Sequence, residues 1–393
     1  MHVLFVTGEY PPMQGGVGAY TAALAQHLQA ENIRTSVVTS TQIGLGSGEK
    51  QADYPRLYPH ISRWGWRIWG KVARLAREIR ADWIHVQYQT AAFGMHPAIN
   101  LAPAVWRRQG LAVAWTYHDL LVPYLFPKAG SWLRRWITER PAFTSRFVVV
   151  TNEGDRRRLS GRVANLAKIP IGSNVPGQLL TPEERRQRRT RRGYGEEELV
   201  VGYFGFLNRS KGGLTLVRTL HELVRGGVNA HLLMIGERVG ASDPTNYAYL
   251  QEVEGLIRTL GLERRVQWTG RQPDGEVSAD LGACDVLFMP YEDGASLRRG
   301  TLMAGLANGC PVVTTTPQAP LPELVDGRDL LFVPPGDPVA GARAIRRIAA
   351  DAELAQRLRE NARERSLLFR WESIARRHRT LYARFLPDPP PGV

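Results

Sequence analysis

The sequence predicts an α/β protein made of two doubly wound domains, each a parallel sheet with helices on both faces. Apolar segments of strand length alternate with helical segments over residues 2–169, and the alternation restarts over residues 199–385. Residues 170–177 (PIGSNVPG) between them read as a loop. Ligands of such sheets bind at the carboxyl ends of the strands, so two facing domains predict a deep cleft there.

In the first half, strands alternate with helices. HVLFVT at residues 2–7 is a continuous apolar run. Leu24 and Leu28 lie on the apolar side of the helix predicted at 18–30. The same criteria predict strands at 33–39, 83–87, 111–117, 147–150 and 166–169, and helices at 64–80, 95–109 and 132–140.

The second half opens with a short helix that carries its own start signals. Thr181 is the N-cap and Pro182 the first helical residue, followed by two acids. Strands are then predicted at 199–204, 230–235, 266–269, 286–289, 311–313 and 331–333, and helices at 214–225, 247–260, 277–282, 300–307, 339–349, 351–365 and 372–385. The predicted organisation is a domain at 1–172, a linker at 173–195, a domain at 196–370 and a disordered Pro-rich tail at 387–393.

Composition predicts a globular cytoplasmic protein. No apolar run approaches the roughly 18–20 residues that cross a bilayer, and the first residues read as a strand rather than a signal peptide. Cys284 and Cys310 stand in apolar strand contexts, as buried thiols of a reducing compartment do. The net charge of +14 favours acidic partners such as nucleotide sugars, anionic lipids or nucleic acid.

The segment 285–313 carries the strongest functional signal. An apolar strand ends at Pro290, a loop offers turn and N-cap residues, and a helix of small residues follows at 300–307. A helix N-terminus just beyond a parallel strand binds anions. Arg298 and Arg299 directly precede this helix, and two cations beside a helix N-terminus suit a diphosphate. The substrate contacts expected here are Asp293, Gly294, Ser296, Arg298, Arg299, Gly300 and Thr301.

Two segments of the first half are further candidates for the site. Glu9 and the glycines Gly15 and Gly16 lie between the first strand and first helix, where backbone N–H groups favour an anion. The spacing departs from G-x-G-x-x-G, and an ordinary strand–helix turn is the alternative. His118 ends a central strand, and Asp119 beside it would fix its tautomer; a histidine bonded to loop backbone is the alternative.

A basic loop follows the first strand of the second half. Arg209 and Lys211 stand at the start of a helix with glycines beside them. A guanidinium fork and an ammonium point charge both suit phosphate oxygens. A solvated basic turn is the alternative.

In their order and spacing these motifs resemble the GT-B glycosyltransferases of family 4, known as glycosyl transferases group 1. Glu9 with Gly15 and Gly16 resembles the opening of that family, and residues 116–119 (TYHD) resemble its T-x-H-D strand end. The resemblance continues through RSKG at 209–212, GCPVV at 309–313, LPELVDG at 321–327 and PPGD at 334–337, and so covers nearly the whole chain.

The resemblance implies two Rossmann-like domains, with a nucleotide-sugar donor held mainly by the C-terminal one and the acceptor mainly by the N-terminal one. It also implies retention of anomeric configuration and no catalytic metal or other cofactor, and the chain contains no D-x-D. As in the family, a last helix at about 371–386 would return to the N-terminal domain.

The chain departs from the family at its pair of glutamates. The E-x7-E positions are Ser296 and Ala304 here, so the contacts that the family makes to donor sugar and ribose must differ. Phe206 replaces the arginine of G-R-L, and Arg209 would take over its role. The chain thus resembles an atypical subgroup that carries D-G-A-S-x-R-R-G.

These departures predict a firm hold on diphosphate. Arg298 and Arg299 add attraction where two carboxylates are lost, and with Arg209 and Lys211 they would stabilise the leaving nucleoside diphosphate. Pairing of these arginines with surface acids is the alternative. Front-face attack, with the leaving phosphate accepting the proton, needs no protein nucleophile, and His118 would bond or align the donor sugar.

Two clusters, 63–71 and 132–136, mix tryptophan with arginine as interfacial helices do. They favour peripheral binding of the protein to the inner, anionic face of the membrane. The alternative is that the tryptophans lie in the core and the arginines are solvated. Residues 185–192 are also rich in arginine and read as an exposed helix. No nucleic-acid-binding module is recognisable, so no nucleic-acid partner is expected.

The sequence therefore predicts a retaining glycosyltransferase that moves a sugar from a nucleoside-diphosphate donor to an unidentified glycan, lipid-linked or small-molecule acceptor. The open alternative is a non-catalytic GT-B homologue that binds a nucleotide sugar or a protein or membrane partner. The missing glutamates favour that alternative, whereas His118, Arg209 and Lys211 favour an enzyme.

Overall fold

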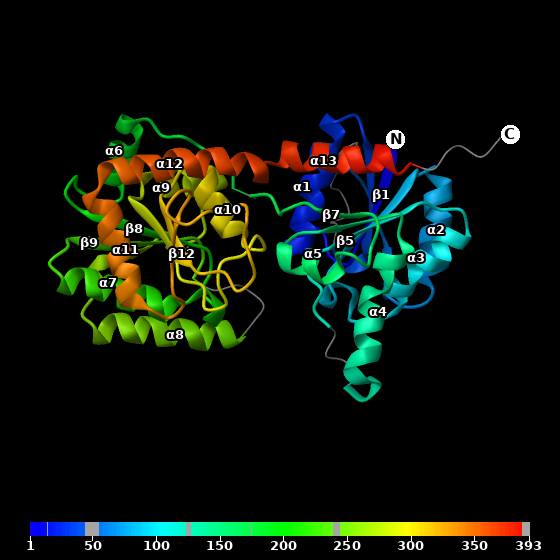
Figure 1. The fold of residues 1–393 in the computed structure, drawn as a ribbon, viewed down its shortest axis with the longest axis horizontal. Helices are drawn as coiled ribbons and strands as arrows, with labels where there is room; N and C mark the ends of the chain where they lie inside the picture. Colours follow the sequence, from blue (N-terminus) through cyan, green and yellow to red (C-terminus); the bar gives the residue numbers. More distant parts are fainter. Residues whose placement is uncertain (14, 44–54, 123–126, 174, 239–243, 387–393) are drawn as a thin grey trace. The chain divides into compact units, whose positions relative to one another are not determined.

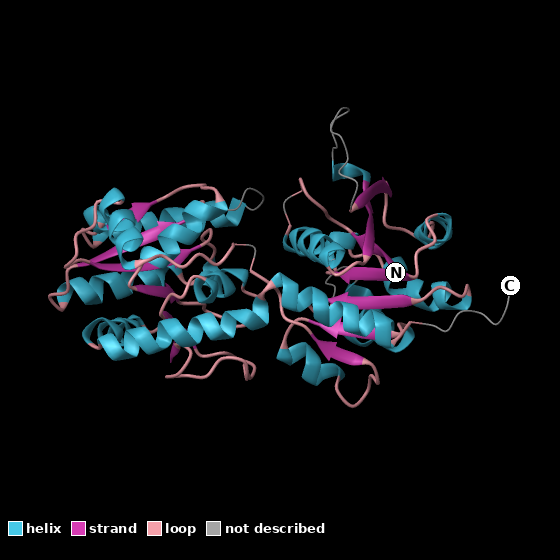
Figure 2. Ribbon diagram, turned by 90° about the horizontal axis from the view of Figure 1, so that it is seen from above, coloured by secondary structure: helices cyan, strands magenta, loops and turns pink. Residues whose placement is uncertain are grey.

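The computed structural model describes residues 1–13, 15–43, 55–122, 127–173, 175–238 and 244–386. The chain forms two compact units: residues 1–172 with the residues from 370 on, and residues 173–369. Each unit holds one sheet with helices on both of its faces (Figure 1, Figure 2). The predicted class, α/β with two parallel sheets, is confirmed. The tail 387–393 lies outside the described residues.

The first unit has a seven-stranded parallel sheet in the order β3-β2-β1-β4-β5-β6-β7. The strands are β1 (His2–Thr7), β2 (Arg34–Ser40), β3 (Arg56–Ile61), β4 (Trp83–Tyr88), β5 (Val113–Tyr117), β6 (Phe147–Val150) and β7 (Leu166–Lys168). The four central strands β1, β4, β5 and β6 are buried along their whole length, as expected for parallel strands covered on both faces.

The helices of this unit are α1 (Gly16–Ala30), α2 (Ile68–Glu78), α3 (Ala98–Arg108), α4 (Gly130–Thr144), α5 (Glu153–Leu159) and α13 (Trp371–Arg384). The last helix, α13, packs along α1 (Figure 1). A Cβ on Gly172 would lie 2.6 Å from the Trp371 ring, so glycine is needed where the chain passes this helix. The Tyr20 hydroxyl of α1 bonds the His378 Nε2 of α13 at 3.1 Å.

The second unit has a six-stranded parallel sheet in the order β10-β9-β8-β11-β12-β13. The strands are β8 (Leu199–Phe204), β9 (Ala230–Ile235), β10 (Val266–Trp268), β11 (Val286–Met289), β12 (Val312–Thr315) and β13 (Leu331–Val333). The helices are α6 (Pro182–Arg191), α7 (Gly213–Arg225), α8 (Pro244–Thr259), α9 (Asp274–Ala283), α10 (Gly300–Ala307), α11 (Pro338–Ala350) and α12 (Ala352–Ser366). Strands β8 and β11 are neighbours, which brings their following loops to one edge of the sheet.

Four of the six arginines of residues 185–192 hold α6 against α9, whereas Arg186 and Arg191 face solvent as predicted. Asp280 is fully buried and accepts from Arg188 Nε at 2.6 Å and from Arg192 Nη2 at 2.6 Å. Asp285 accepts from Arg189 Nη1 at 2.8 Å and also pairs with Arg185. Much of the basic charge at residues 173–195 is thus neutralised inside the second unit.

Three details of secondary structure differ from the prediction. Strand β3 and helix α5 were not predicted, and α2 begins at Ile68 rather than at residue 64. Trp64 instead lies in the loop before α2 and is buried against Phe93, at 4.7 Å between ring centroids. Within the described residues, none of the helices combines the length and the apolar character that a membrane crossing requires.

Candidate functional site

Two cations predicted to bind phosphate lie in the loop after β8. Asn208 accepts a hydrogen bond from the Lys211 amide at 3.1 Å and so starts the 3₁₀ helix Arg209–Lys211. Gly205 has a φ of +107°, and a Cβ there would lie 3.0 Å from both Lys211 Nζ and Thr301 Cγ2. Glycine is therefore required where the strand turns into this loop.

Lys211 is a buried cation, with 7% of its surface exposed. Its Nζ lies 3.8 Å from the centroid of the Phe206 ring, which provides a cation–π contact. Burial, and to a smaller extent the charge of Arg299, lowers the pKa of Lys211 to about 8. Across the described ranges, no carboxylate forms an ion pair with it. A buried ammonium group without such a partner favours the binding of an external anion.

Arg299, at the start of α10, is held by its neighbours. Its Nη2 donates to both carboxylate oxygens of Asp293, and its Nη1 lies 3.4 Å from Ser210 Oγ. Its guanidinium carbon lies 4.7 Å from the centroid of the Tyr291 ring. The hydroxyl of Tyr291 in turn bonds Thr301 Oγ1 at 2.9 Å. Asp293 and Tyr291 thus place the guanidinium next to the loop that carries Lys211.

The other two predicted cations are exposed. Arg209 Nη2 lies 3.1 Å from both carboxylate oxygens of Glu252, and its guanidinium carbon lies 5.1 Å from the centroid of the Tyr249 ring. The alternative of pairing with acids therefore describes both Arg209 and Arg299 in this structure. Arg298 lies on the surface. Lys211 is the buried member of the four.

The loop before α10 is fixed by backbone contacts. Gly294 has a φ of +77°, and a Cβ there would lie 2.6 Å from the Thr316 carbonyl oxygen. The expected side-chain cap on α10 is wrong: Arg299 is its N-cap residue and makes no side-chain cap bond. The Ser296 carbonyl accepts from the Arg299 amide at 3.2 Å, which makes a turn just before Gly300. The helix therefore begins without a carboxylate or hydroxyl on its N-terminus.

In the first unit, a carboxylate of the protein itself occupies the N-terminus of α1. Glu9 Oε1 accepts from the Val17 amide at 3.0 Å and from the Gly18 amide at 3.2 Å. A Cβ on Gly15 would lie 2.2 Å from this carboxyl group, whereas nothing lies within 4 Å of a Cβ on Gly16. Two of the N–H groups that the sequence assigned to a ligand anion are thus used by Glu9.

His118 lies just beyond the carboxyl end of β5, with 8% of its surface exposed. Its Nε2 lies 3.0 Å from Gln87 Oε1, and its ring meets the Tyr20 ring edge-on at 4.6 Å. The Gln87 amide thus binds one ring nitrogen of His118 and holds the ring in place. Burial lowers the pKa of His118 to about 3, so the imidazole is neutral. Asp119, predicted to orient it, accepts from the Leu121 amide at 3.2 Å.

Gln87 is the residue that the sequence prediction missed. It is the penultimate residue of β4, and β4 pairs with β5, the strand that leads to His118. The signal available in the sequence was a polar residue at the end of a predicted buried strand. Its Nε2 is buried and makes no hydrogen bond in the described structure, so it offers a donor beside His118.

A pocket of about 530 Å³ opens in the first unit at the carboxyl ends of β1, β2 and β4. Trp64 and Phe93 supply apolar surface, and Arg63 supplies a cation. His96 also lines it, and burial together with the Arg63 charge lowers the pKa of His96. The remaining polarity comes from the hydroxyl and amide groups of Ser40, Gln42, Ser62 and Gln89, and from the Glu9 carboxylate, which already accepts from two amides of α1. This mixture suits a ligand rich in hydroxyl groups that also carries negative charge.

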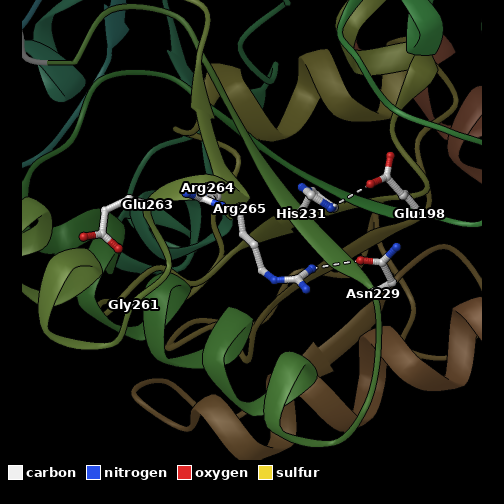
Figure 3. Close-up of a pocket in the computed structure, with 7 residues that line it drawn as sticks. All are labelled: Glu198, Asn229, His231, Gly261, Glu263, Arg264 and Arg265. Carbon is white, nitrogen blue, oxygen red and sulfur yellow. Dashed lines mark hydrogen bonds and ion pairs between the residues drawn. The ribbon is translucent and has the colours of Figure 1, made fainter.

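A second pocket, of about 610 Å³, lies at the opposite, amino end of the sheet in the second unit (Figure 3). His231 Nε2 lies 2.9 Å from Glu198 Oε1, and Arg265 Nη1 donates to Asn229 Oδ1 at 2.9 Å. These side chains bind each other across β8, β9 and the turn before β10. The pocket is separate from the loops that carry Lys211, which lie at the carboxyl end of the same sheet.

No cluster of three or more histidine, cysteine, aspartate or glutamate side chains able to hold a metal ion occurs among the residues that the structure describes. The two cysteines are buried and reduced. Burial is the main cause of the raised pKa of both thiols.

Curated proteins of known role are similar to this chain. It is 29% identical over 224 residues to a D-inositol 3-phosphate glycosyltransferase of Corynebacterium jeikeium, a match that covers 56% of this chain and 52% of that protein. The chain thus spans about half the length of that relative. It is 26% identical over 364 residues to a GDP-mannose-dependent alpha-(1-6)-phosphatidylinositol monomannoside mannosyltransferase of Mycolicibacterium smegmatis, and that match covers 89% of each chain.

Solved structures share the fold. HepE of Anabaena in complex with UDP and glucose superposes with a TM-score of 0.73 at 18% identity, over 98% of this chain and all of that one. At that level of identity, the similarity establishes the GT-B fold and nothing finer.

Two family models match the chain, one to each half. Glycosyltransferase Family 4 matches residues 14–169, and Glycosyl transferases group 1 matches residues 198–351. Together they span most of the chain, in the order expected for the two sheets. The chain belongs to the family 4, or group 1, glycosyltransferases and has their GT-B fold.

Proposed function

We propose that this protein is a retaining glycosyltransferase that moves a sugar from a nucleoside-diphosphate donor to a hydroxyl-bearing acceptor without a catalytic metal. Lys211 is the observation that carries the proposal. It is a buried ammonium group at the carboxyl end of β8, packed on Phe206, with a lowered pKa and with Arg299 nearby. A diphosphate would supply the negative charge that this position favours.

In this proposal, the second unit binds the donor diphosphate. Lys211 contacts the phosphates as a point charge, and Arg299, oriented by Asp293, contacts them as a fork. Arg209 and Arg298 add exposed positive charge at the rim. Ser296, Gly300 and Thr301 present the uncapped start of α10 to the same phosphates.

The residues at the two positions where the family has glutamates, Ser296 and Ala304, fit a donor site that binds mainly the diphosphate. Ala304 is fully buried in the core of the second unit, so the side chain at this position contacts no ribose. Ser296 is half-buried and carries no charge. Donor binding would then depend on the diphosphate more than on sugar or ribose carboxylate contacts. The leaving phosphate would accept the acceptor proton, with no protein nucleophile.

In the first unit, we assign His118 as a neutral hydrogen-bonding group for the transferred sugar. Gln87 holds its ring in place and offers an amide donor beside it. We assign the acceptor to the 530 Å³ pocket near Glu9, because its hydroxyl and amide lining suits a polyol and Arg63 suits a phosphate. Relatives named for inositol 3-phosphate and for a phosphatidylinositol mannoside make a phosphorylated cyclitol a reasonable first acceptor to test.

The test is the charge of Lys211. Lys211→Met keeps the aliphatic stem and removes the ammonium group. At pH 7, where a group with a pKa of about 8 is mostly charged, we expect UDP and GDP to bind at least about tenfold more weakly. Titration calorimetry measures binding, and release of nucleoside diphosphate from UDP-glucose and GDP-mannose measures turnover.

Lys71→Met, on α2 of the first unit, is the matched control, and it should bind and turn over like the wild type. If Lys211→Met and Lys71→Met bind nucleotide with equal affinity, the proposed donor site is wrong. Tight donor binding by the wild type, without transfer or hydrolysis under any acceptor, would favour the non-catalytic homologue.

A further inference from the structure

The two clusters that mix tryptophan with arginine differ in the structure. In residues 63–71, Trp64 is buried and Trp69 Nε1 donates to the Ala98 carbonyl at 2.8 Å, so both serve the core. Trp66, with 49% of its surface exposed, packs edge-on against the rings of Trp69 and His96. The core alternative therefore holds for most of this first cluster.

The second cluster, residues 132–136, lies near the start of α4 and is exposed. Trp132 has 76% of its surface exposed and Trp136 has 44%, and Leu133 is exposed between them. The two tryptophans are four residues apart, so they share one side of the helix. We call Trp132, Leu133 and Trp136 the apolar tip of α4.

The other half of α4 anchors the helix. Thr138, Glu139, Pro141, Ala142 and Thr144 are buried, and α4 packs against α3. Figure 1 shows α4 extending beyond the other helices of its unit. A helix that is held at one end and projects at the other presents its tip to a surface, not to a groove. Three large apolar side chains on such a tip need a partner that covers them.

The charge around the tip has one sign. Lys128, Arg134 and Arg135 accompany the tryptophans, and no acidic residue occurs from residue 128 to residue 138. The next acid, Glu139, is buried and already binds Arg158 at 2.8 Å and Arg162 at 2.9 Å. The tip therefore presents apolar and positive groups together.

We propose that the tip of α4 docks this protein onto anionic lipid bilayers. Trp132, Leu133 and Trp136 enter the headgroup region, where the amphipathic indole ring is at its most favourable. Lys128 and Arg135 meet the lipid phosphates. Charge complementarity selects the partner: a convex tip with indoles and cations suits an anionic interface, which offers negative charge and apolar depth at the same place.

This docking does not depend on the proposed transfer reaction, and the two can fail separately. The full-length protein is mixed with vesicles of neutral phosphatidylcholine or with vesicles that contain phosphatidylglycerol, and bound protein is separated by sedimentation. We expect binding to the anionic vesicles and at least about tenfold less to the neutral ones. The Lys211→Met protein should bind vesicles as the wild type does.

The deciding variant is Trp132→Ser/Trp136→Ser, and the matched control is Trp66→Ser, an exposed tryptophan from the first cluster. The double variant should lose at least about tenfold in vesicle affinity, while the control keeps it. Lys128→Gln/Arg135→Gln should weaken binding to the anionic vesicles alone. Circular dichroism and thermal unfolding show that each variant is folded.

Three results would overturn the proposal: no vesicle binding by the wild type, equal binding to neutral and anionic vesicles, or equal losses in the double variant and in Trp66→Ser. A different result would assign the tip to a protein contact instead. In that case the wild type would not bind vesicles but would form concentration-dependent dimers, and the double variant would not form them.

Discussion

At the scale of single residues, Glu9 changes the chemistry of a helix N-terminus. The glycine-rich loop suggested an empty anion site, and that inference follows from the N–H groups at the start of α1. The structure places the Glu9 carboxylate on two of those groups. Gly15 is then needed because any side chain there would overlap this carboxylate, although its φ of −179° is open to every residue.

This geometry predicts unequal effects for neighbouring glycines. Gly15→Ala should displace the Glu9 carboxylate and cost about 1–2 kcal/mol of unfolding free energy, as the loss of a helix cap does. Urea unfolding followed by tryptophan fluorescence measures this in the first unit, because residues 173–369 contain a single tryptophan, Trp268. Gly16→Ala is the control and should be neutral or slightly stabilising, since a Cβ there has open space. Equal losses in both variants would contradict the role given to Glu9.

The sequence predicted individual chemical groups better than their partners. Lys211 and His118 are visible as polar residues after apolar strands. Gln87 beside His118 is a pairing between two strands, and the sequence alone does not give their register. The Asp293 contact to Arg299 likewise depends on how the loop before α10 turns. The candidate site residues could therefore be named from the sequence, whereas their hydrogen-bond and ion-pair partners could not.

At the scale of elements, α6 shows that a run of arginines can be structural. Its arginines looked like an exposed basic helix because the acids that bind them lie some 90 residues further along the chain. Asp280 of α9 and Asp285 before β11 accept from four of them. The element and its exposed face were predicted correctly, and the face that binds Asp280 and Asp285 was not.

Breaking this cluster should destabilise the second unit. Asp280→Asn leaves Arg188 and Arg192 without their buried charge partner, so we expect a loss of about 3–5 kcal/mol. Urea unfolding followed by circular dichroism measures it. Glu183→Gln removes the exposed partner of Arg186, a pair that solvent screens, and should cause only a small loss of stability. A loss of that small size for Asp280→Asn would mean that α6 is held by apolar packing instead.

The elements that the sequence missed share a physical cause. Strand β3 contains Pro59, lies at the edge of the sheet and is only partly buried, so it has no continuous apolar run. Helix α5 contains three consecutive arginines, and the Asn152 cap and the Glu153 ion pairs stabilise it rather than an apolar stripe. Strands buried on both faces, such as β1 and β8, carry the apolar run that makes prediction work.

At the scale of the whole chain, the first unit combines residues 1–172 with helix α13, which packs against α1. Helix α13 covers the sheet through a buried network of rings: Tyr20 bonds His378, and His85 bonds Tyr382. His118 touches the same Tyr20. Burial lowers the pKa of His118 and of His378 to about 3, and that of His85 well below its ordinary value. Three neutral imidazoles thus lie at or beside the contact between α13 and the rest of the first unit.

These depressed pKa values make the first unit sensitive to acid. The unfolded histidines bind protons near pH 6.5 and the folded ones do not, so stability is full above about pH 6.5 and declines as pH falls toward 3. Each histidine should remove about 1.4 kcal/mol of unfolding free energy per pH unit below 6.5.

Unfolding by urea between pH 7.5 and 5.5, followed by tryptophan fluorescence, measures the slope of stability against pH. His378→Gln keeps a hydrogen-bonding group for Tyr20 and removes one titration, so it should lower that slope by up to about 1.4 kcal/mol per pH unit. His221→Gln is the control, because His221 lies on α7 of the second unit, outside the unit whose unfolding tryptophan fluorescence mainly reports. If His378→Gln leaves the slope unchanged, the acid sensitivity does not arise where α13 meets the sheet.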